Sequence, residues 1–239
     1  MSQQLLAFTG MTPSLNVWDA ALSGQLGLGA GQGIIQKRST RSIGASLDLH
    51  ILGYRSRLQY SPLDLNTPVS STRGFTFRGA NYLPADRLNL NFKWNTLDLE
   101  MRILNIGEDN LRMELVGGIQ SNQTRVQLQA SNRALSSDYS GTVVIPYFGL
   151  RSEMKMTEHL NLMGTAKLMD LEVLGNRIDY LDADISMRYS LAKNSDHLGS
   201  FIFGYRHREL NLRLDQGKAN EGVMNLELKG PYAAWRIHF

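Results

Sequence analysis

Apolar and polar residues alternate along much of this chain. In the segment 181–191, "LDADISMRYSL", every odd position is apolar or Tyr and every even position is Asp, Ser or Arg. A period of two is typical of a β-strand with one apolar and one polar face. The segment is also about as long as the roughly 9–11 residues with which a tilted strand crosses a bilayer.

The same alternation recurs in "SIGASLDLHI", "YRSRLQY", "TLDLEMRI" and "NLRMELVGGI", and turn-forming stretches such as "NIGEDN" and "DQGKANEG" separate the runs. Together they predict ten strands, at 14–29, 41–50, 54–63, 86–103, 110–131, 141–156, 159–174, 177–192, 197–213 and 222–239. We therefore expect an all-β fold, an antiparallel up-and-down barrel that forms a single domain over 1–239. Residues 1–13 are expected to precede it as an N-terminal periplasmic segment.

Two features complicate this pattern. "SLNVWDAALSG" also fits a short helix capped by Ser14, but the Gly-rich stretch that follows favours a strand. The face that carries the apolar residues also changes within several runs, at 51–52, 95–96, 209–210 and 230–231. Such a change predicts a turn or a bulge, so the last strand is expected to be bulged at Gly230 and Pro231.

Composition removes several classes of protein. The chain has no Cys, which excludes disulfides, thiolate chemistry and Cys-based metal sites. A mean hydropathy of −0.25 and the lack of a run of about 18 apolar residues exclude a helical membrane protein. A net charge of +3 without a basic block does not indicate a nucleic-acid partner. The first residues do not resemble a signal peptide, so a mature chain is expected. No cofactor or metal is indicated.

The long strands and the turns, which are mostly short on one side and longer on the other, favour an outer-membrane barrel over a soluble barrel or sandwich that binds a ligand. The final "KGPYAAWRIHF", with "LHILGYRSRLQYSPLDL" and "FGYRHRELNLRLD" upstream, resembles an uncharacterised family of Gram-negative outer-membrane β-barrel proteins. The resemblance implies the barrel fold and a location in the outer membrane. We expect a monomer, with lipid, lipopolysaccharide and the barrel-assembly machinery as partners. The resemblance also implies an assembly signal formed by Tyr232, Trp235, Ile237 and Phe239. It implies no activity.

If the apolar faces meet lipid, the charged faces point into the lumen. The expected lumen-lining residues are Asp48, His50, Arg55, Arg57, Asp98, Glu100, Arg102, Arg112, Glu114, Arg151, Glu153, Lys155, Asp182, Asp184 and Arg188, together with Asp19 and Lys167. So many buried charges must pair or stay hydrated. The sequence therefore favours a lumen filled by salt bridges, and a narrow passage for small solutes is the alternative, because open channels need more strands.

An outer-membrane enzyme acting on lipid or peptide is a further alternative. Omptin proteases place two acidic residues opposite an Asp-His pair, which invites comparison with Asp182 and Asp184 and with Asp48 and His50. Both pairs are expected away from the outer rim, so the match is poor. His207 lies between Arg206 and Arg208, which fits a phosphate contact as well as catalysis.

A second group of basic residues falls in the predicted outer loops: Lys37, Arg38, Arg41, Arg73, Arg78 and Arg87. Arg forms bidentate contacts with phosphates. These residues are therefore expected either to contact lipopolysaccharide or to remain a solvated cluster.

Overall fold

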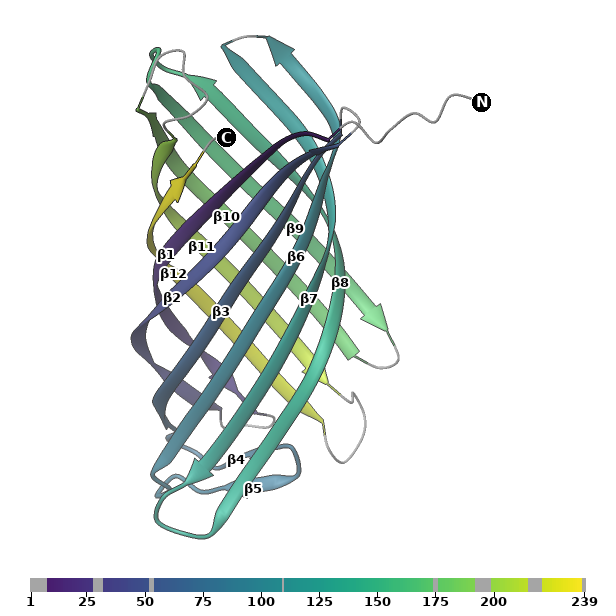
Figure 1. The fold of residues 1–239 in the computed structure, drawn as a ribbon. Coiled ribbons are helices and arrows are strands. Elements are labelled where there is room, and N and C mark those ends of the chain that lie inside the picture. Colours follow the sequence, from purple (N-terminus) through teal and green to yellow (C-terminus); the bar gives the residue numbers. More distant parts are fainter. Residues whose placement is uncertain are drawn as a thin grey trace.

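The computed structural model describes residues 8–27, 32–51, 54–108, 110–173, 176–191, 199–214 and 221–237. The chain forms a closed antiparallel barrel of ten long strands (Figure 1). These are β1 (Phe8–Leu26), β2 (Gly33–Ile51), β3 (Tyr54–Ser70), β6 (Leu88–Glu108), β7 (Leu111–Ala130), β8 (Leu135–Lys155), β9 (Leu160–Val173), β10 (Asn176–Ser190), β11 (Ser200–Leu214) and β12 (Gly222–Arg236). Each pairs with its sequence neighbours, and β12 closes on β1. The predicted fold class is confirmed.

The strand boundaries differ from the prediction at several places. β2 begins at Gly33 rather than at 41, so Lys37 and Arg38 lie on a strand and their predicted loop position is wrong. β8 begins at Leu135 rather than at 141. β1 begins at Phe8, and its first residues pair with the end of β2, so 8–13 belong to the barrel wall rather than to a preceding segment. β3 continues to Ser70, and the long connection after it contains a short hairpin of β4 (Phe75–Phe77) and β5 (Ala80–Tyr82). The strand interpretation of "SLNVWDAALSG" is confirmed, because the segment lies within β1.

One ladder in the wall is interrupted. Between Ile35 and Ala45 of β2 no residue pairs with β3, and side-chain hydroxyls bridge the two strands instead. Thr40 donates to the carbonyl of Asp64 at 2.9 Å, and Thr67 donates to that of Gln36 at 3.0 Å. β3 carries two prolines along this stretch, at 62 and 68, and proline has no N–H to give to a ladder.

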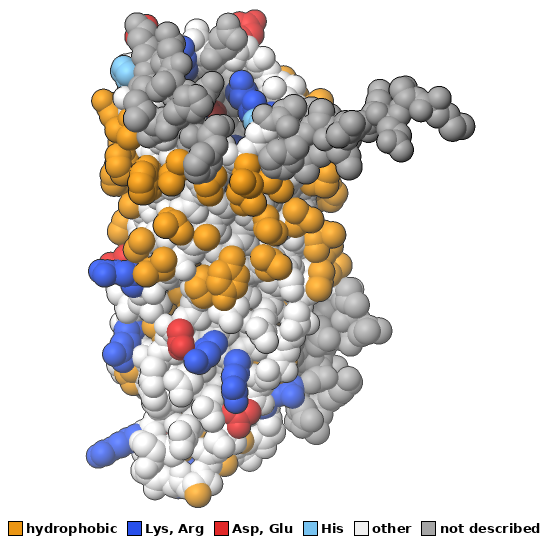
Figure 2. Space-filling view, viewed as in Figure 1, with side chains coloured by type: hydrophobic (Ala, Val, Ile, Leu, Met, Phe, Trp, Pro, Cys, Tyr) orange, Lys and Arg blue, Asp and Glu red, His pale blue; other side chains and the backbone are white. Residues whose placement is uncertain are grey.

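The outer surface of the barrel is apolar over the half that contains the chain termini. Leu97, Leu99, Met101 and Ile103 of β6 point outward and are 46–54% exposed. Figure 2 shows hydrophobic side chains gathered in a belt over this half, with Lys, Arg, Asp and Glu beyond it toward the β4–β5 end. Such a belt suits hydrocarbon, since in water it would be an unusually large exposed apolar surface. The described part of the chain has no helix long and apolar enough to cross a membrane.

The inside of the barrel has the opposite arrangement. Toward the β4–β5 end the lumen is filled by a cluster of buried side chains, which we call the apolar plug. Its members are Trp18, Ala20, Leu22, Leu26, Ile35, Leu63, Leu65, Val69, Phe75, Phe77, Tyr82, Leu88, Leu90, Phe92, Trp94, Val126, Leu128, Ala130, Ile145, Ile178, Tyr180, Leu210, Leu212, Met224, Leu226 and Leu228. The hairpin contributes to it, and the Tyr82 hydroxyl lies 2.7 Å from Ser137 Oγ. Toward the termini the lumen is polar.

The changes of apolar face within strands follow from this inversion. Along β6 the even positions from Leu88 to Glu100 all point inward, although apolar side chains give way to polar ones at Thr96. The pairing of β11 with β12 likewise continues without a shift through Gly230 and Pro231. The predicted bulge at these two residues is therefore wrong. The side-chain direction is constant, and the surroundings of each face change instead.

Candidate functional site

The polar half of the lumen contains a cavity of about 400 Å³. It reaches the end of the barrel near the β2–β3 and β6–β7 connections, where Arg55 is exposed at its edge. Its charged lining consists of Asp48, Arg55, Arg57, Glu100, Arg102, Arg112, Glu114, Arg151, Glu153, Lys167, Asp182, Asp184, Arg188, Arg206 and Arg236, with His50 beside them. The cavity ends in the opposite direction at Trp18, the first side chain of the apolar plug.

Asp182 of β10 anchors the floor of this cavity. Its carboxylate accepts hydrogen bonds from Arg206 Nε at 2.7 Å, from Arg208 Nη2 at 3.0 Å and from the Tyr180 hydroxyl at 3.0 Å. Asp182 is 4% exposed and Arg208 is 3% exposed. A buried carboxylate is stable only when its oxygens are satisfied in this way. Asp182 therefore holds two buried guanidinium groups in place.

A second cluster surrounds Lys167 of β9. Its ammonium lies 2.6 Å from Asp98 Oδ2, 2.8 Å from Glu100 Oε2 and 3.1 Å from the Tyr147 hydroxyl. Tyr147 donates in turn to Asp98 Oδ1 at 2.7 Å. Arg151 binds the other oxygen of Glu100. These contacts join β6, β8 and β9 across the lumen.

Further ion pairs line the walls nearer the cavity edge. Asp48 binds Arg57 at 3.0 Å through Nη2 and also Arg236 at 3.0 Å. Three more pairs of described residues belong to the network, namely Arg102 with Glu114, Arg188 with Glu153, and Arg151 with Glu114 at 4.0 Å. The Tyr232 hydroxyl donates to Asp184 at 3.0 Å.

The structure places most of the predicted lumen residues together. All of them line the cavity except Asp98, which is buried in the Lys167 cluster, Lys155, which is exposed at the end of β8, and Asp19. Asp19 lies on the outer surface of β1, between the inward-facing Trp18 and Ala20. Its predicted lumen position is wrong, because at this level the apolar residues face inward and the charged residues face water.

The two pairs that were compared with the omptin site, Asp48 with His50 and Asp182 with Asp184, lie among the charged residues of the cavity. Asp48 is paired with two arginines, and His50 stands beside Arg55 in the β2–β3 ladder. Asp182 is held by two further arginines. Neither pair faces the end of the barrel at which the outer rim was expected, since the lumen there is filled by the apolar plug.

His207 was associated in the sequence with Arg206 and Arg208, but the strand separates them. The arginines point into the lumen, whereas His207 lies on the outer face, 2.9 Å from Glu209 and 3.8 Å from Glu227. In the described part of the chain these three side chains form the group that could approach a metal ion. Lys229 already binds Glu227 at 2.8 Å, so the group is satisfied as an ionic cluster at the edge of the belt.

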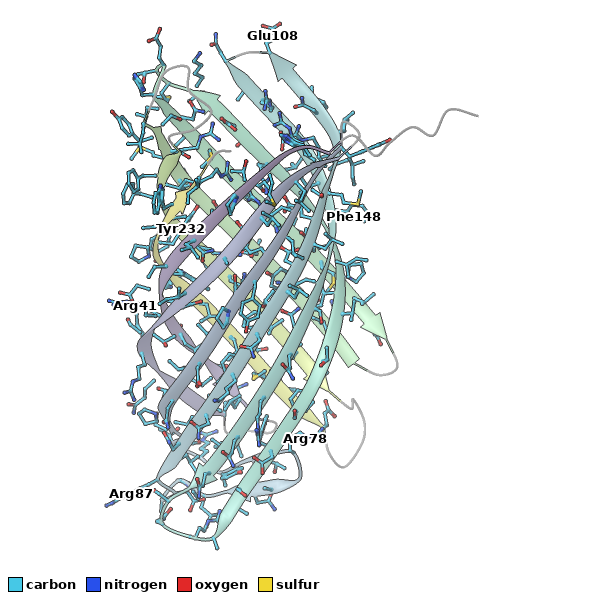
Figure 3. All side chains as sticks on the ribbon, viewed as in Figure 1. Arg41, Arg78, Arg87, Glu108, Phe148 and Tyr232 are labelled. Atoms are coloured by element: carbon cyan, nitrogen blue, oxygen red, sulfur yellow. The ribbon has the colours of Figure 1, made fainter. Side chains whose placement is uncertain are left out.

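The predicted outer-loop basic residues divide into two sets. Lys37, Arg38 and Arg41 are exposed on β2, and Arg41 lies beside the barrel wall well away from the tip (Figure 3). Arg78 and Arg87 lie at the β4–β5 end, and Arg73 is in the same connection. The two sets are thus at different heights, which the sequence did not indicate.

The residues of the predicted assembly signal also differ in direction. Trp235 is 48% exposed on the outer surface, whereas Tyr232 lines the cavity. Ile237 donates its backbone N–H to Pro13 at 3.0 Å, which fixes the end of β12 beside β1. Phe239 lies outside the described residues, as do 52–53 of the predicted β2–β3 turn.

The sequence interpretation missed several residues that organise the lumen. Arg206, Arg208, Arg236, Tyr147 and Tyr180 all hold carboxylates, and Trp18 and Trp94 close the floor. The signal that could have found the arginines is their spacing. Arg206 and Arg208 occupy even positions of β11, as do Leu210 and Leu212. In a strand without a bulge, all four side chains point to the same face, which is the inward one.

Comparisons with known proteins support this description of the fold. No protein-family model and no curated protein sequence matches the chain. Among solved structures, the outer membrane protease OmpT from Escherichia coli matches with a TM-score of 0.64 at 14% identity, over 100% of both chains. The fold is that of a transmembrane β-barrel. The transport unit of the autotransporter AIDA-I from Escherichia coli matches with a TM-score of 0.50 at 9% identity, over 100% of this chain and 92% of that one. At these identities the likeness concerns the fold alone.

Proposed function

We propose that this protein is an integral outer-membrane β-barrel of a Gram-negative bacterium that does not conduct solutes between its two ends. Both termini are periplasmic in this proposal, so the polar cavity opens toward the periplasm. The β4–β5 end lies beyond the outer leaflet. The role is structural or that of a binding protein, rather than that of a pore.

The apolar plug is the observation that carries this proposal. Leu22, Leu90, Leu128 and Leu228, from four different strands, have 0% exposure. Ions crossing the barrel would have to displace these side chains, and an apolar interior offers no compensation for lost hydration. The plug therefore argues against the narrow-passage alternative. It also argues against a hydrolase acting inside that part of the lumen, because buried apolar side chains of the described residues fill it.

Planar-bilayer recording tests this proposal. The wild-type protein is expected to give no discrete conductance steps in symmetric salt. A variant with Leu90→Gly, Phe92→Gly and Leu128→Gly removes plug side chains and should give salt-dependent steps if it retains the heat-modifiable gel mobility of a folded barrel. A matched variant with Leu97→Gly, Leu99→Gly and Leu115→Gly alters the belt and should remain silent. Steps from the wild type would refute the proposal.

Lipopolysaccharide contact is proposed for Lys37, Arg38 and Arg41. Arg41 pairs in register with Asp19, and its neighbour toward the termini on the outer face is Ile43, which is 63% exposed and belongs to the belt. Cations at the edge of an apolar belt stand where lipid phosphates are expected. K37Q/R38Q/R41Q should reduce the lipopolysaccharide that copurifies with the barrel, whereas R73Q/R87Q at the far tip should not. Equal retention by both variants would remove this part of the proposal.

Recognition of the last strand by the barrel-assembly machinery is also proposed. The outward direction of Trp235 supports it, since an assembly signal must be accessible on the unfolded or nascent strand and tolerated by lipid afterwards. Deletion of Phe239 or W235A should lower the fraction of folded barrel in cells while leaving refolding in detergent unchanged. Y232F, which removes only a lumenal hydrogen bond, should not reduce assembly. A loss of refolding in detergent as well would indicate a purely structural effect.

A further inference from the structure

We infer that the polar cavity is a binding site for a small, multiply charged oxyanion, such as a phosphate or carboxylate compound, that enters from the end carrying the termini. This goes beyond the proposed function, because a barrel closed at one end need not bind a solute. The inference depends on the charge and shape of the cavity. It does not depend on the orientation in the membrane.

The first argument is the charge balance of the cavity. Among the described residues, nine Lys and Arg side chains line it against six Asp and Glu side chains, which leaves an excess of three positive charges in this set. Buried cations are stable when each has an anionic partner. An excess inside a narrow barrel therefore calls for anions from solution.

The second argument is where the excess lies. Among the described residues, Asp48, Glu100, Glu114, Glu153 and Asp182 each accept at least one ion pair. Arg55 and Arg112 form no ion pair with any carboxylate that the structure describes, and both line the cavity. They lie near the opening, so a ligand reaches them without crossing the network below.

The third argument is that two like charges lie on neighbouring strands. Ser56 pairs with Met101, which puts Arg55 beside Arg102 on the lumenal face. Like charges placed opposite one another on neighbouring strands destabilise a sheet. Arg102 has Glu114 as a partner, but its buried Nε has no hydrogen-bond acceptor. Arg236, deeper in the same cavity, also has a buried Nε without an acceptor. An oxyanion between the Arg55 and Arg102 side chains offsets this repulsion, whereas the two Nε atoms are too buried to meet it directly.

The size of the cavity sets the class of ligand. A volume of about 400 Å³ falls in the range of roughly 300–1,000 Å³ of small-molecule sites. Most of the lining side chains are ionic or polar, and the apolar ones, such as Trp18, Val116, Met163 and Ile202, are in the minority. A compact anion with two or more negative charges matches the guanidinium groups, which bind phosphate and carboxylate in bidentate fashion.

Isothermal titration calorimetry of the full chain in detergent micelles tests the inference. Pyrophosphate and citrate are the probes, and sucrose and putrescine are the neutral and cationic controls. The wild type should bind the two anions only, with affinity that falls as salt is added. R55Q/R112Q should weaken anion binding by about tenfold or more, since both charges lie at the opening. K93Q/R125Q makes the same change of net charge with two exposed side chains on the outer surface and should leave binding unchanged.

Neither arginine of the test variant has a carboxylate partner in the described structure. Replacing the two arginines therefore leaves no buried carboxylate without its partner. If the double variant still fails to show a heat-modifiable gel shift, R55Q alone serves in its place and should weaken binding in the same direction. Absence of anion binding by the folded wild type overturns the inference. So does weakening by K93Q/R125Q equal to that by R55Q/R112Q, because this would indicate a general charge effect.

Glycerol 3-phosphate and its acylated form, lysophosphatidic acid, distinguish the source of the anion. Tighter binding of glycerol 3-phosphate identifies a solute from the aqueous phase, and tighter binding of the acylated form identifies a lipid headgroup. Either preference is consistent with an oxyanion site, whereas binding of neither contradicts it. The conductance recordings are independent of this result, so failure of one proposal does not conceal failure of the other.

Discussion

The Arg208 guanidinium lies 5.1 Å from the centre of the Trp94 ring, at the level where the lumen changes from ionic to apolar. The rings of Trp18 and Tyr180 stand at 5.5 Å and 5.9 Å from the same guanidinium. The aromatic faces satisfy the buried cation from the side of the plug, and Asp182 satisfies it from the side of the cavity. The two halves of the lumen thus meet at Arg208, and Arg206 joins Asp182 to the Trp18 ring in the same way.

Loss of Asp182 should destabilise the barrel strongly. Asp182→Ala leaves Arg206 and Arg208 buried without their carboxylate, and breaking a buried ion pair in this way costs about 3–5 kcal/mol. The free energy of unfolding in urea, measured in lipid vesicles, should fall by that order. Asp170→Ala removes an exposed partner of Arg177 on the outer surface and should change it by less than about 1 kcal/mol. Similar losses from both variants would contradict the proposed role of Asp182.

The apolar plug should contribute to stability like a soluble protein core. Phe92 has 0% exposure and packs with Trp94 at a ring-centre distance of 6.2 Å. Phe92→Ala should lower the free energy of unfolding by about 3–5 kcal/mol. Phe148→Ala makes the same chemical change in the belt, where the side chain is 68% exposed (Figure 3), and should cost less. The comparison fails if Phe148→Ala costs as much as Phe92→Ala.

The loop after β5 should show a pH-dependent contact. Arg133 donates to Asp86 at 2.8 Å through Nε, and this hydrogen bond lowers the pKa of the Asp86 carboxyl below its ordinary value. The stabilisation is therefore present above the pKa of the unfolded chain, about 3.9, and is lost as the pH falls through the lower pKa of the folded state.

The amide of Leu83 provides the measurement for this contact, because it donates to Asp86 Oδ2 at 2.7 Å. Its NMR chemical shift should titrate below pH 3.9, the ordinary aspartate value, and Arg133→Gln should move the midpoint upward. Arg125→Gln, on the outer surface of β7, serves as the control and should leave the midpoint in place. If Arg133→Gln leaves the titration midpoint of the Leu83 amide unchanged, the ion pair between Arg133 and Asp86 is not formed.

The sequence alone predicts the fold because strand alternation, turn residues and strand length all depend on local chemistry. It cannot assign both faces of a strand when their surroundings change along its length. From Leu88 to Trp94 of β6 the apolar residues face the plug, whereas from Leu97 to Ile103 they face outward. The alternation of apolar and polar residues shows which face of a strand has apolar surroundings. It does not show whether these surroundings are the inside of the barrel or lipid.

In several strands the apolar face changes from inward to outward at the same height in the barrel, and the sequence interpretation did not use this agreement. Trp94 pairs with Thr124, and Gly230 with Arg206, so reversals in neighbouring strands occur where the lumen changes character. A reversal in one strand indicates a bulge, but reversals at the same level in several strands indicate a change of environment. The ion-pair partners could not be predicted, because Asp182 and Arg208 are 26 residues apart and meet only through strand register.

Cysteine accessibility tests the divided lumen most directly, because the chain has no native Cys. Single cysteines at Thr165, which lines the cavity, and at Ala20, which is a 0% exposed member of the plug, are compared in the folded barrel with a small, charged thiol reagent. T165C should react and A20C should not until the barrel is unfolded. Rapid modification of both, or of A20C alone, would contradict a lumen that is polar toward the termini and closed by an apolar plug at the other end.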